Sequence, residues 1–278
     1  MIALEKVRFE SARKGLTLAL PGLEPSHDQR YASLVTVASA SGGVGCSTVA
    51  MLFAWLAAQS DIRTALLEAD LQFGDYGSWL SLDDTEPTLG DGPFAASIPL
   101  AESLQLYKAP LFPEQADEVD EDIASLVPKI RNGYDLMVAD AGSHWSGLTA
   151  ELARKSDLVL LVFDSRRSSA ISACKAAELC ARLGVPSTKV QPVYNRWSSK
   201  ATLSAKEAMR LFGLKDVPCI PDGKQAVDAL MSVGEAAELI ASSNPAVRGV
   251  NGLLKEVLPK IGCVGSPDEG HSKRGLRR

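Results

Sequence analysis

The apolar residues between positions 31 and 262 fall mostly in short unbroken runs rather than in an alternating pattern. An unbroken apolar run is typical of a strand that is buried on both faces, as in a parallel sheet covered by helices. The pattern predicts strands over Leu34–Ser39, Thr64–Glu68, Leu104–Ala109, Leu136–Asp140, Leu158–Phe163, Val190–Tyr194 and Val217–Ile220.

Helices fit between these runs. Apolar residues recur at helical spacing in Ser169–Leu183 and Ala246–Leu258, and Ser204–Phe212 opens on a plausible N-cap serine. We also expect helices over Ser47–Gln59, after the first strand, and over Glu118–Arg131, before the fourth. Strands and helices then alternate along the chain with short connections. This order predicts an α/β fold, a doubly wound and mostly parallel sheet with helices on both faces.

The two ends of the chain lack this alternation. Residues 1–30 are charged throughout, with a candidate short strand at Leu16–Leu20 and prolines typical of a linker, so we assign them to an N-terminal extension. Residues 31–262 are expected to form one domain, and residues 263–278 a flexible polar and basic tail. The tail is either a solvated end or an electrostatic contact for acidic lipid or nucleic acid.

Composition narrows the setting in which the protein works. The 278 residues include 34 acidic and 29 basic side chains, and the net charge of −5 argues against nucleic-acid binding over the whole surface. Five cysteines form no C-x-x-C pair, as expected for reduced thiols in the cytoplasm. No secretory signal is recognisable, and no run reaches the ~18 apolar residues of a membrane span. We therefore expect a cytoplasmic protein whose membrane association, if any, is peripheral.

The first predicted strand leads into the segment Ser41-Gly42-Gly43-Val44-Gly45-Cys46-Ser47-Thr48. Small residues between a strand and a helix let backbone N–H groups converge on an anion, and the helix N-terminus adds partial positive charge. Ser47 and Thr48 stand where a phosphate-binding loop has its hydroxyls. The motif G-x-x-x-x-G-K-[ST] is broken, because Ala40 and Cys46 replace its first glycine and its lysine. By itself, the segment also fits an ordinary glycine-rich turn.

Acidic residues follow or end three of the predicted strands, at Glu68 and Asp70, at Asp140 and at Asp164. In an open α/β sheet the carboxyl ends of the strands border the ligand crevice. We expect Glu68 and Asp70 to leave their strand on the same face, because they are two residues apart. Each acid alone fits a helix cap or a solvated turn better than a site. Their order behind a glycine-rich loop favours a nucleotide site.

These segments together resemble the ParA/MinD family of P-loop ATPases, and within it the CpaE/TadZ branch associated with Tad/Flp pilus assembly. The family loop K-G-G-x-G-K-[ST] corresponds to residues 41–47, and the branch pattern D-x-D-L-Q-F-G-D corresponds to Glu68–Asp75. The family's late asparagine-arginine pair is similar to Asn195-Arg196, and its isoleucine-proline turn to Ile220-Pro221-Asp222. The resemblance extends from Leu34 to Leu258.

The resemblance implies that the domain binds ATP and Mg²⁺. The phosphates would be held by the backbone of Gly42, Gly43, Val44, Gly45, Cys46, Ser47 and Thr48. Ser47 would ligate Mg²⁺, with Asp140 ordering its water shell, and Asp70 would orient the attacking water. Asn195 would hydrogen-bond the adenine edge, and the backbone of Pro221 and Asp222 would close over the base.

Two departures from the family loop bear on catalysis. Cys46 replaces the lysine that pairs with phosphate, and Ser41 replaces the signature lysine that reaches across the dimer. Phosphoryl transfer relies on positioning and charge neutralisation, so hydrolysis is expected to be weak or partner-dependent. We interpret Cys46 as a tolerated small substitute for the lysine. The alternative hypothesis is a redox switch, because a thiol at a helix N-terminus tends toward a lowered pKa.

The resemblance implies a homodimer that positions pilus or secretion machinery, with peripheral membrane association through those partners. A second interpretation is a scaffold of the same fold that does not hydrolyse ATP. A third is a DNA-partitioning or division-site-selection ATPase, which the acidic charge disfavours. Nucleic acid is therefore not expected as a partner.

Overall fold

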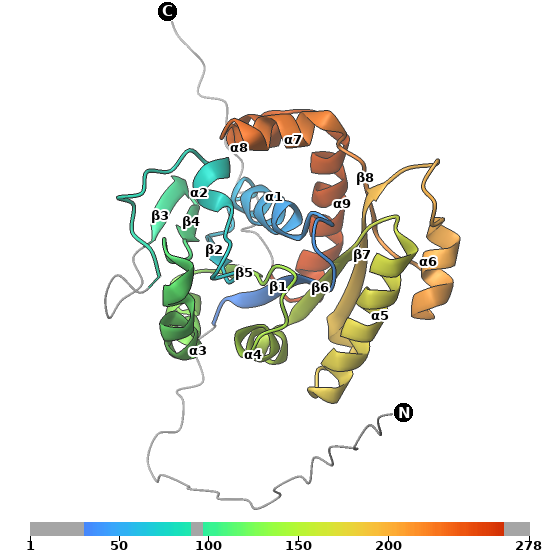
Figure 1. The fold of residues 1–278 in the computed structure, drawn as a ribbon, viewed down its shortest axis with the longest axis horizontal. Helices are drawn as coiled ribbons and strands as arrows, with labels where there is room; N and C mark the ends of the chain where they lie inside the picture. Colours follow the sequence, from blue (N-terminus) through green and yellow to red (C-terminus); the bar gives the residue numbers. More distant parts are fainter. Residues whose placement is uncertain (1–30, 90–96, 264–278) are drawn as a thin grey trace, which may run out of the picture. The chain divides into compact units, whose positions relative to one another are not determined.

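The computed structural model describes residues 31–89 and 97–263 of the chain. The predicted extension 1–30, its candidate strand Leu16–Leu20 and residues 264–278 of the predicted tail lie outside them. Within the described residues the chain forms a sheet with helices on both faces, as predicted (Figure 1).

The described residues contribute eight strands, in the spatial order β3-β4-β2-β5-β1-β6-β7-β8. All neighbouring strands are parallel except the antiparallel pair β3 and β4. On one side of β1 lie β6, β7 and β8 in sequence order, and on the other side lie β5, β2, β4 and β3, so the chain builds the sheet in both directions from β1, as in a doubly wound fold. The strands are β1 Ser33–Ser39, β2 Thr64–Glu68, β3 Ile98–Ala101, β4 Leu104–Tyr107, β5 Leu136–Asp140, β6 Leu158–Phe163, β7 Val190–Trp197 and β8 Cys219–Pro221.

The helices divide between the two faces of the sheet. In Figure 1, α1, α7, α8 and α9 lie on one side and α3, α4 and α5 on the other. None of the helices in the described part of the chain is long and apolar enough to cross a membrane. Their bounds are α1 Cys46–Ala58, α2 Tyr76–Trp79, α3 Ala116–Arg131, α4 Gly147–Lys155, α5 Arg167–Arg182, α6 Ala205–Phe212, α7 Gln225–Ser232, α8 Ala236–Ala241 and α9 Pro245–Lys260.

Neighbouring residues of the central strands belong to opposite cores. Val35 and Val138 pack in the core that contains α1 and α9, whereas Leu34 and Met137 pack in the core that contains α3 and α4. All four side chains are completely buried. Successive side chains of a strand point to opposite faces, so a strand covered on both faces must be apolar throughout. This packing is the physical reason for the unbroken apolar runs.

All seven predicted strands are present, although β7 continues to Trp197 and β8 begins at Cys219 instead of Val217. The five predicted helices correspond to α1, α3, α5, α6 and α9. The prediction missed β3, α2, α4, α7 and α8. Each of these has nine residues or fewer, and a short element repeats its apolar period too few times to be distinguished from a loop.

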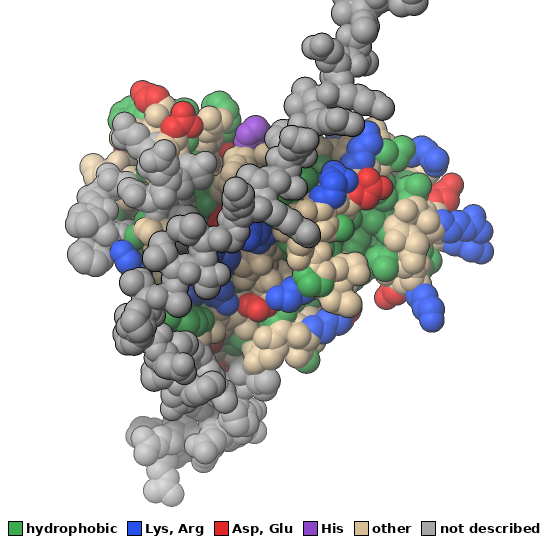
Figure 2. Space-filling view, turned by 90° about the horizontal axis from the view of Figure 1, so that it is seen from below, with side chains coloured by type: hydrophobic (Ala, Val, Ile, Leu, Met, Phe, Trp, Pro, Cys, Tyr) green, Lys and Arg blue, Asp and Glu red, His purple; other side chains and the backbone are tan. Residues whose placement is uncertain are grey.

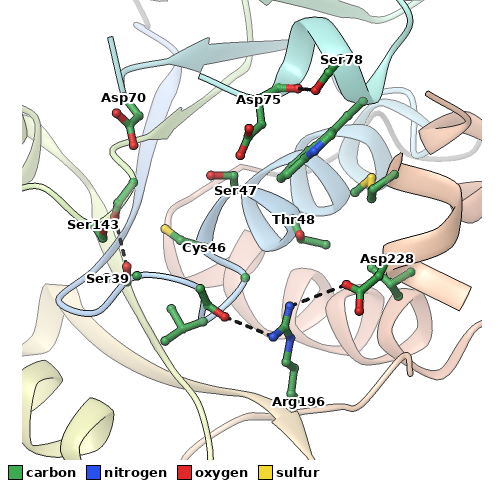
Figure 3. A pocket seen from close by; sticks show the side chains of 18 of the residues that line it. Ser39, Cys46, Ser47, Thr48, Asp70, Asp75, Ser78, Ser143, Arg196 and Asp228 are labelled. Atoms are coloured by element: carbon green, nitrogen blue, oxygen red, sulfur yellow. Dashed lines mark hydrogen bonds and ion pairs between the residues drawn. The ribbon is translucent and has the colours of Figure 1, made fainter. Parts of the chain in front are cut away.

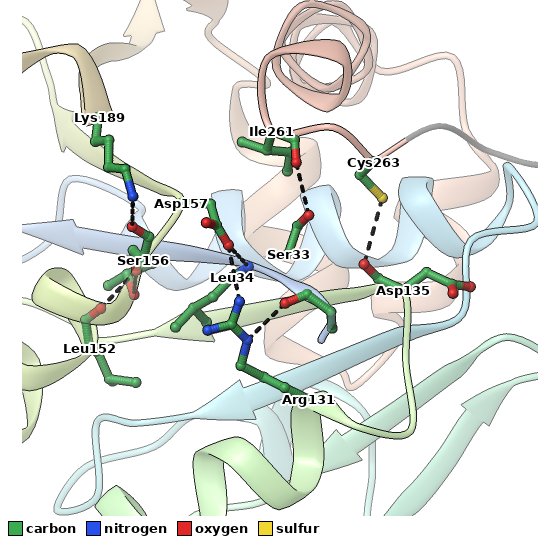
Figure 4. A network of polar contacts seen from close by, with 12 residues as sticks. Ser33, Leu34, Arg131, Asp135, Leu152, Ser156, Asp157, Lys189, Ile261 and Cys263 are labelled. Atoms are coloured by element: carbon green, nitrogen blue, oxygen red, sulfur yellow. Dashed lines mark hydrogen bonds and ion pairs between the residues drawn. The ribbon is translucent and has the colours of Figure 1, made fainter. Parts of the chain in front are cut away.

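Polar contacts link the elements at the amino ends of the strands (Figure 4). The backbone N–H of Leu34 donates to Asp157 over 2.9 Å, and the same carboxylate pairs with Arg131 at 3.1 Å. The Ser33 hydroxyl donates to the carbonyl of Ile261 at the end of α9, 3.0 Å away. These polar groups are thus paired within the protein. The loop after β1 lies on the opposite side of the sheet, at the carboxyl ends of the strands.

Candidate functional site

The loop after β1 depends on glycine at two positions. Gly43 and Gly45 have φ angles of +73° and +83°, a region that other residues rarely adopt. Gly45 directly precedes α1, and a Cβ atom there would lie 2.5 Å from the side-chain nitrogen of Asn195. The left-handed turn at Gly45 therefore brings the backbone against β7 and starts the helix there.

Three side chains, two from β7 and one from the residue before α5, hold successive carbonyl groups of this loop. Arg166 donates to the carbonyl of Gly42 over 3.0 Å, Arg196 to that of Gly43 over 3.1 Å, and Asn195 to that of Val44 over 2.8 Å. In a trans peptide the N–H points away from the C=O. The N–H groups of Gly43, Val44 and Gly45 are thus directed away from these three side chains and find no acceptor among the described residues.

The loop lines a pocket of about 440 Å³ (Figure 3). Asp70 and Asp75 enter it from the segment after β2, and Asp228 enters it from α7. A second pocket of about 310 Å³ contains Asn195 and Asp222. The two pockets adjoin, because both are lined by Gly45, Thr48, Arg196, Val227 and Asp228. Free N–H groups, a helix N-terminus and a second recess suit a phosphate chain with a base.

Cys46 occupies the position of the missing lysine and is buried. Its Sγ lies 3.8 Å from Oδ1 of Asp140. Burial, followed by the negative charge of Asp140, raises the pKa of the thiol well above its usual value. The expected lowering of the Cys46 pKa is therefore wrong. A desolvated thiol beside a carboxylate stays protonated, so the helix N-terminus does not make it the reactive thiolate that the redox-switch hypothesis needs.

Asp140, at the end of β5, is almost fully buried beside the start of α1. It accepts hydrogen bonds from the Tyr76 hydroxyl at 2.9 Å and from the N–H of Gly142 at 3.1 Å. Burial raises its pKa, and a hydrogen bond from the Ser47 side chain opposes that rise. Ser47 and Asp140 therefore meet, as Mg²⁺ coordination between phosphate and protein oxygens requires. The described residues hold no cluster of three His, Cys, Asp or Glu side chains that could bind a metal ion without a ligand.

Asp70 and Glu68 do not share one environment, contrary to our expectation from their spacing. Asp70 lies against the backbone of Gly142 and lines the pocket. Glu68 is buried and accepts hydrogen bonds from the N–H groups of Tyr76, at 3.0 Å, and of Ala109, at 2.9 Å. The chain leaves the strand after Glu68, so the period of two no longer applies at Asp70. Of these two carboxylates, only Asp70 lines the pocket, where it could contact a ligand.

The remaining predicted site residues lie near the second pocket. The buried Asn195 lines this pocket while its amide holds the loop at Val44. Asp222 also lines it, with its carboxylate accepting from the N–H of Lys224 at 3.0 Å. Pro221 does not line it and instead borders a hollow between β8 and α9. Asp164 is outside both pockets and pairs with Arg166 at 2.7 Å.

Sequence reasoning assigned no role to four side chains that organise the site, those of Arg166, Arg196, Tyr76 and Asp228. Arg166 pairs with Asp164 and donates to the loop, so it connects the two. Tyr76 follows directly after the recognised segment Glu68–Asp75. Its hydroxyl contact with Asp140 joins residues 64 positions apart, which no local pattern signals. The arginines were detectable only as neighbours of residues already singled out.

No family profile matches the sequence, and no curated protein matches it. Solved structures do match its fold. A ParA family ATPase from Chlorobium tepidum superimposes with a TM-score of 0.73 at 20% identity, over 80% of this chain and 98% of that one. The septum site-determining protein MinD from Pyrococcus horikoshii, complexed with Mg-ADP, gives 0.71 at 16% identity, over 81% and 96%. A chain of the MinC:MinD cell division complex from Aquifex aeolicus gives 0.68 at 19% identity, over 89% and 99%.

These superpositions span nearly the whole of each solved chain. They agree with the doubly wound order of the sheet and with the glycine-rich loop between β1 and α1. The chain therefore has the P-loop fold of the ParA and MinD ATPases.

Proposed function

We propose that the protein binds an adenine nucleotide with Mg²⁺ and acts as a dimerising positioning or assembly factor with weak or partner-dependent ATP hydrolysis. The observation that carries this proposal is the loop before α1. Three of its carbonyl groups accept hydrogen bonds from Arg166, Arg196 and Asn195, and the consecutive N–H groups of the same peptides point the other way and are free to bind phosphate. The MinD chain of the same fold was solved with Mg-ADP, which is the ligand class that the loop suits.

The residues present would divide the work at the nucleotide. The loop backbone from Gly42 to Thr48 would bind the phosphates, and Ser47 with Asp140 would hold Mg²⁺. Asp70 would orient water for attack on the terminal phosphate. Asn195 and Asp222 would border the base in the second pocket, with Pro221 acting only through the backbone behind it.

Weak hydrolysis follows from the charge at the loop. A lysine at position 46 would place an ammonium group on the phosphates, whereas Cys46 turns a neutral thiol toward Asp140. Ser41 offers no charge either. Loss of one preorganised electrostatic contact costs on the order of 10²–10³ in rate. We therefore expect binding with little turnover unless a partner supplies a cation.

The test is calorimetric titration of Mg·ATP, with phosphate release measured on the same samples of the native protein and of Cys46→Lys. We expect the native protein to bind with little turnover. Lysine at position 46 should raise turnover roughly 100-fold, provided that Asp70 and Asp140 are correctly placed. Cys46→Ala is the control, because it removes the thiol without adding a charge. Cys180→Lys is not suitable as a control, because Cys180 is buried in a hydrophobic core. Absence of binding by both the native protein and Cys46→Lys would overturn the proposal.

Two other functions use the same fold. A scaffold that binds nucleotide without hydrolysis would bind Mg·ATP and show no turnover with any partner. A DNA-partitioning or division-site ATPase would need a basic surface. On the face in Figure 2, basic side chains lie among acidic ones over the described residues, which gives this function no specific support. Salt-sensitive DNA binding would revive it.

The pilus assignment rests on the segment Glu68–Asp75 and on nothing else in the molecule. Within this segment Phe73 has 74% of its surface exposed, whereas Leu71 is buried. An exposed phenylalanine three residues after Asp70 suits a contact with a second copy or with a pilus or secretion partner, through which the protein would reach the membrane. Nucleotide-dependent capture of purified pilus assembly proteins tests this assignment.

A further inference from the structure

The pocket beside the loop is short of positive charge. Three of its lining side chains are acidic, Asp70, Asp75 and Asp228. Among the described residues that line it, Arg196 is the one with a cationic side chain. Burial and the nearby charge of Asp70 raise the pKa of Asp75, as expected where carboxylates crowd together. A polyphosphate entering this pocket would need a cation besides Mg²⁺.

Arg196 is in the right place to provide that cation. It lies where the two pockets adjoin, and a nucleotide with phosphates in one and its base in the other would pass beside it. Its guanidinium reaches the loop itself, with Nη1 donating to the carbonyl of Gly43 over 3.1 Å (Figure 3). The N–H groups of the loop point away from this contact, so Arg196 would reach a phosphate from the junction of the two pockets, which it lines, and not from within the loop.

The backbone directs Arg196 toward the loop. Its φ angle is +55°, a left-handed conformation that a residue with a side chain rarely adopts. The register between β7 and β8 shifts between Tyr194 and Trp197, on either side of this residue. Such irregularities re-aim a side chain at the end of a strand and concentrate at functional sites.

Arg196 has a second partner that it can exchange. Its Nη2 lies 3.9 Å from Oδ1 of Asp228 on α7, and both side chains are exposed, by 46% and 75%. An exposed pair at this distance holds weakly, whereas guanidinium and phosphate form charge-assisted hydrogen bonds. Asp228 thus competes with an anionic ligand for Arg196.

We propose that Arg196 supplies the phosphate-neutralising charge that the loop has lost at Cys46, and that Asp228 holds this arginine when no phosphate is bound. The inference rests on the proposed nucleotide binding. It adds that occupancy of the pocket is transmitted to α7, because the phosphate takes Arg196 from its partner on that helix.

The test is calorimetric titration of Mg·ATP into Arg196→Gln, Arg196→Lys, Asp228→Asn and the double variant Arg196→Gln/Asp228→Asn. Glutamine keeps a donor for the Gly43 carbonyl but loses the charge, and lysine keeps the charge. We expect Arg196→Gln to weaken binding roughly 10- to 100-fold, and Arg196→Lys to weaken it much less. Asp228→Asn should strengthen binding about threefold, and only while Arg196 is present.

Arg182→Gln is the matched control, because it removes the same charge from an exposed pair with Glu178 on α5. Titration with adenosine, which has no phosphate, is a second control, and Arg196→Gln should weaken adenosine binding far less than Mg·ATP binding, although Arg196 also lines the base pocket. If the native protein binds Mg·ATP and Arg196→Gln binds it equally well, the inference is wrong while the proposed function stands. If Asp228→Asn strengthens binding equally in the Arg196→Gln background, Asp228 does not act through Arg196. If the native protein does not bind Mg·ATP, the proposed function itself fails.

Discussion

At the residue scale, the pKa of the Glu68 carboxyl group is subject to two opposing effects, burial and hydrogen bonding. It is buried at the end of β2, and burial raises its pKa to about 7. The N–H groups of Tyr76 and Ala109 donate to its two oxygens and act in the opposite direction. Glu68 thereby connects the first residue of α2 to Ala109, two residues after the end of β4. A change in its ionisation reaches the folding free energy directly.

The pKa of Glu68 predicts a pH-dependent stability. Since the pKa is about 7 in the folded protein and 4.5 without perturbation, the folded state binds more protons between these values. The contribution is therefore present below pH 4.5 and is lost as pH rises through 7, by on the order of 3 kcal/mol. Urea unfolding at pH 5 and pH 8 should show the native protein losing stability relative to Glu68→Gln, which cannot ionise. A constant difference between the two proteins at both pH values would contradict the raised pKa.

At the scale of elements, the start of α1 rests on the conformation of Gly45. Gly45→Ala would force a side chain into a left-handed turn with φ of +83° and against the amide of Asn195. We expect a loss of stability of about 1–3 kcal/mol and loss of Mg·ATP binding, because the N–H groups of the loop would shift. Thermal unfolding and calorimetry measure the two effects.

Gly184→Ala is a matched control for this prediction. Gly184 has a similar φ of +86°, but a Cβ there would meet no atom within 4 Å. It should lose stability through backbone strain alone and keep full nucleotide affinity. Equal affinities of Gly45→Ala and the native protein would show that the loop does not bind the phosphates.

The elements that the sequence predicted are those with long apolar patterns. Strands such as β5 and β6 are buried along their whole length, α9 repeats its apolar period over several turns, and α1 is apolar along almost its whole length. The helices α2 and α7 are short, and their role comes from side chains that line the pocket. No local signal shows that Tyr76 meets Asp140 or that Asp228 meets Arg196, because the fold alone brings these residues together.

The sequence likewise predicted the parts of the site that follow from local pattern, and not those that depend on packing. The loop, Asp70 and Asp140 lie together because each ends or follows a strand at the carboxyl edge of a parallel sheet. The thiol of Cys46 was misjudged because the helix N-terminus is a local feature, whereas burial beside Asp140 depends on the packing of α1 against β5. The separation of Glu68 from Asp70 likewise depends on where the chain leaves β2.

At the scale of the whole molecule, the amino ends and the carboxyl ends of the strands differ in what their polar groups do. At the amino ends, side chains such as Arg131 and Asp157 pair with one another and with the backbone. At the carboxyl ends, the N–H groups of the loop and the carboxylate of Asp70 face a pocket. A ligand bound there would contact segments from β1, β2, β7 and α7 at once. Under the proposed dimerisation, a ligand bound there would change the surface that is offered to a second copy of the chain.

The last prediction concerns self-association. If nucleotide binding promotes a dimer, sedimentation equilibrium should show the monomer shifting toward dimer on addition of Mg²⁺ with a non-hydrolysable ATP analogue. Phe73→Ala should weaken this shift without loss of stability, because its side chain is 74% exposed and follows Asp70 in the segment that lines the pocket. Ile171→Ala, which shortens an exposed apolar side chain on α5, is the matched control and should leave the shift unchanged. A protein that binds the analogue and remains monomeric would argue for a nucleotide-bound scaffold that acts through other partners.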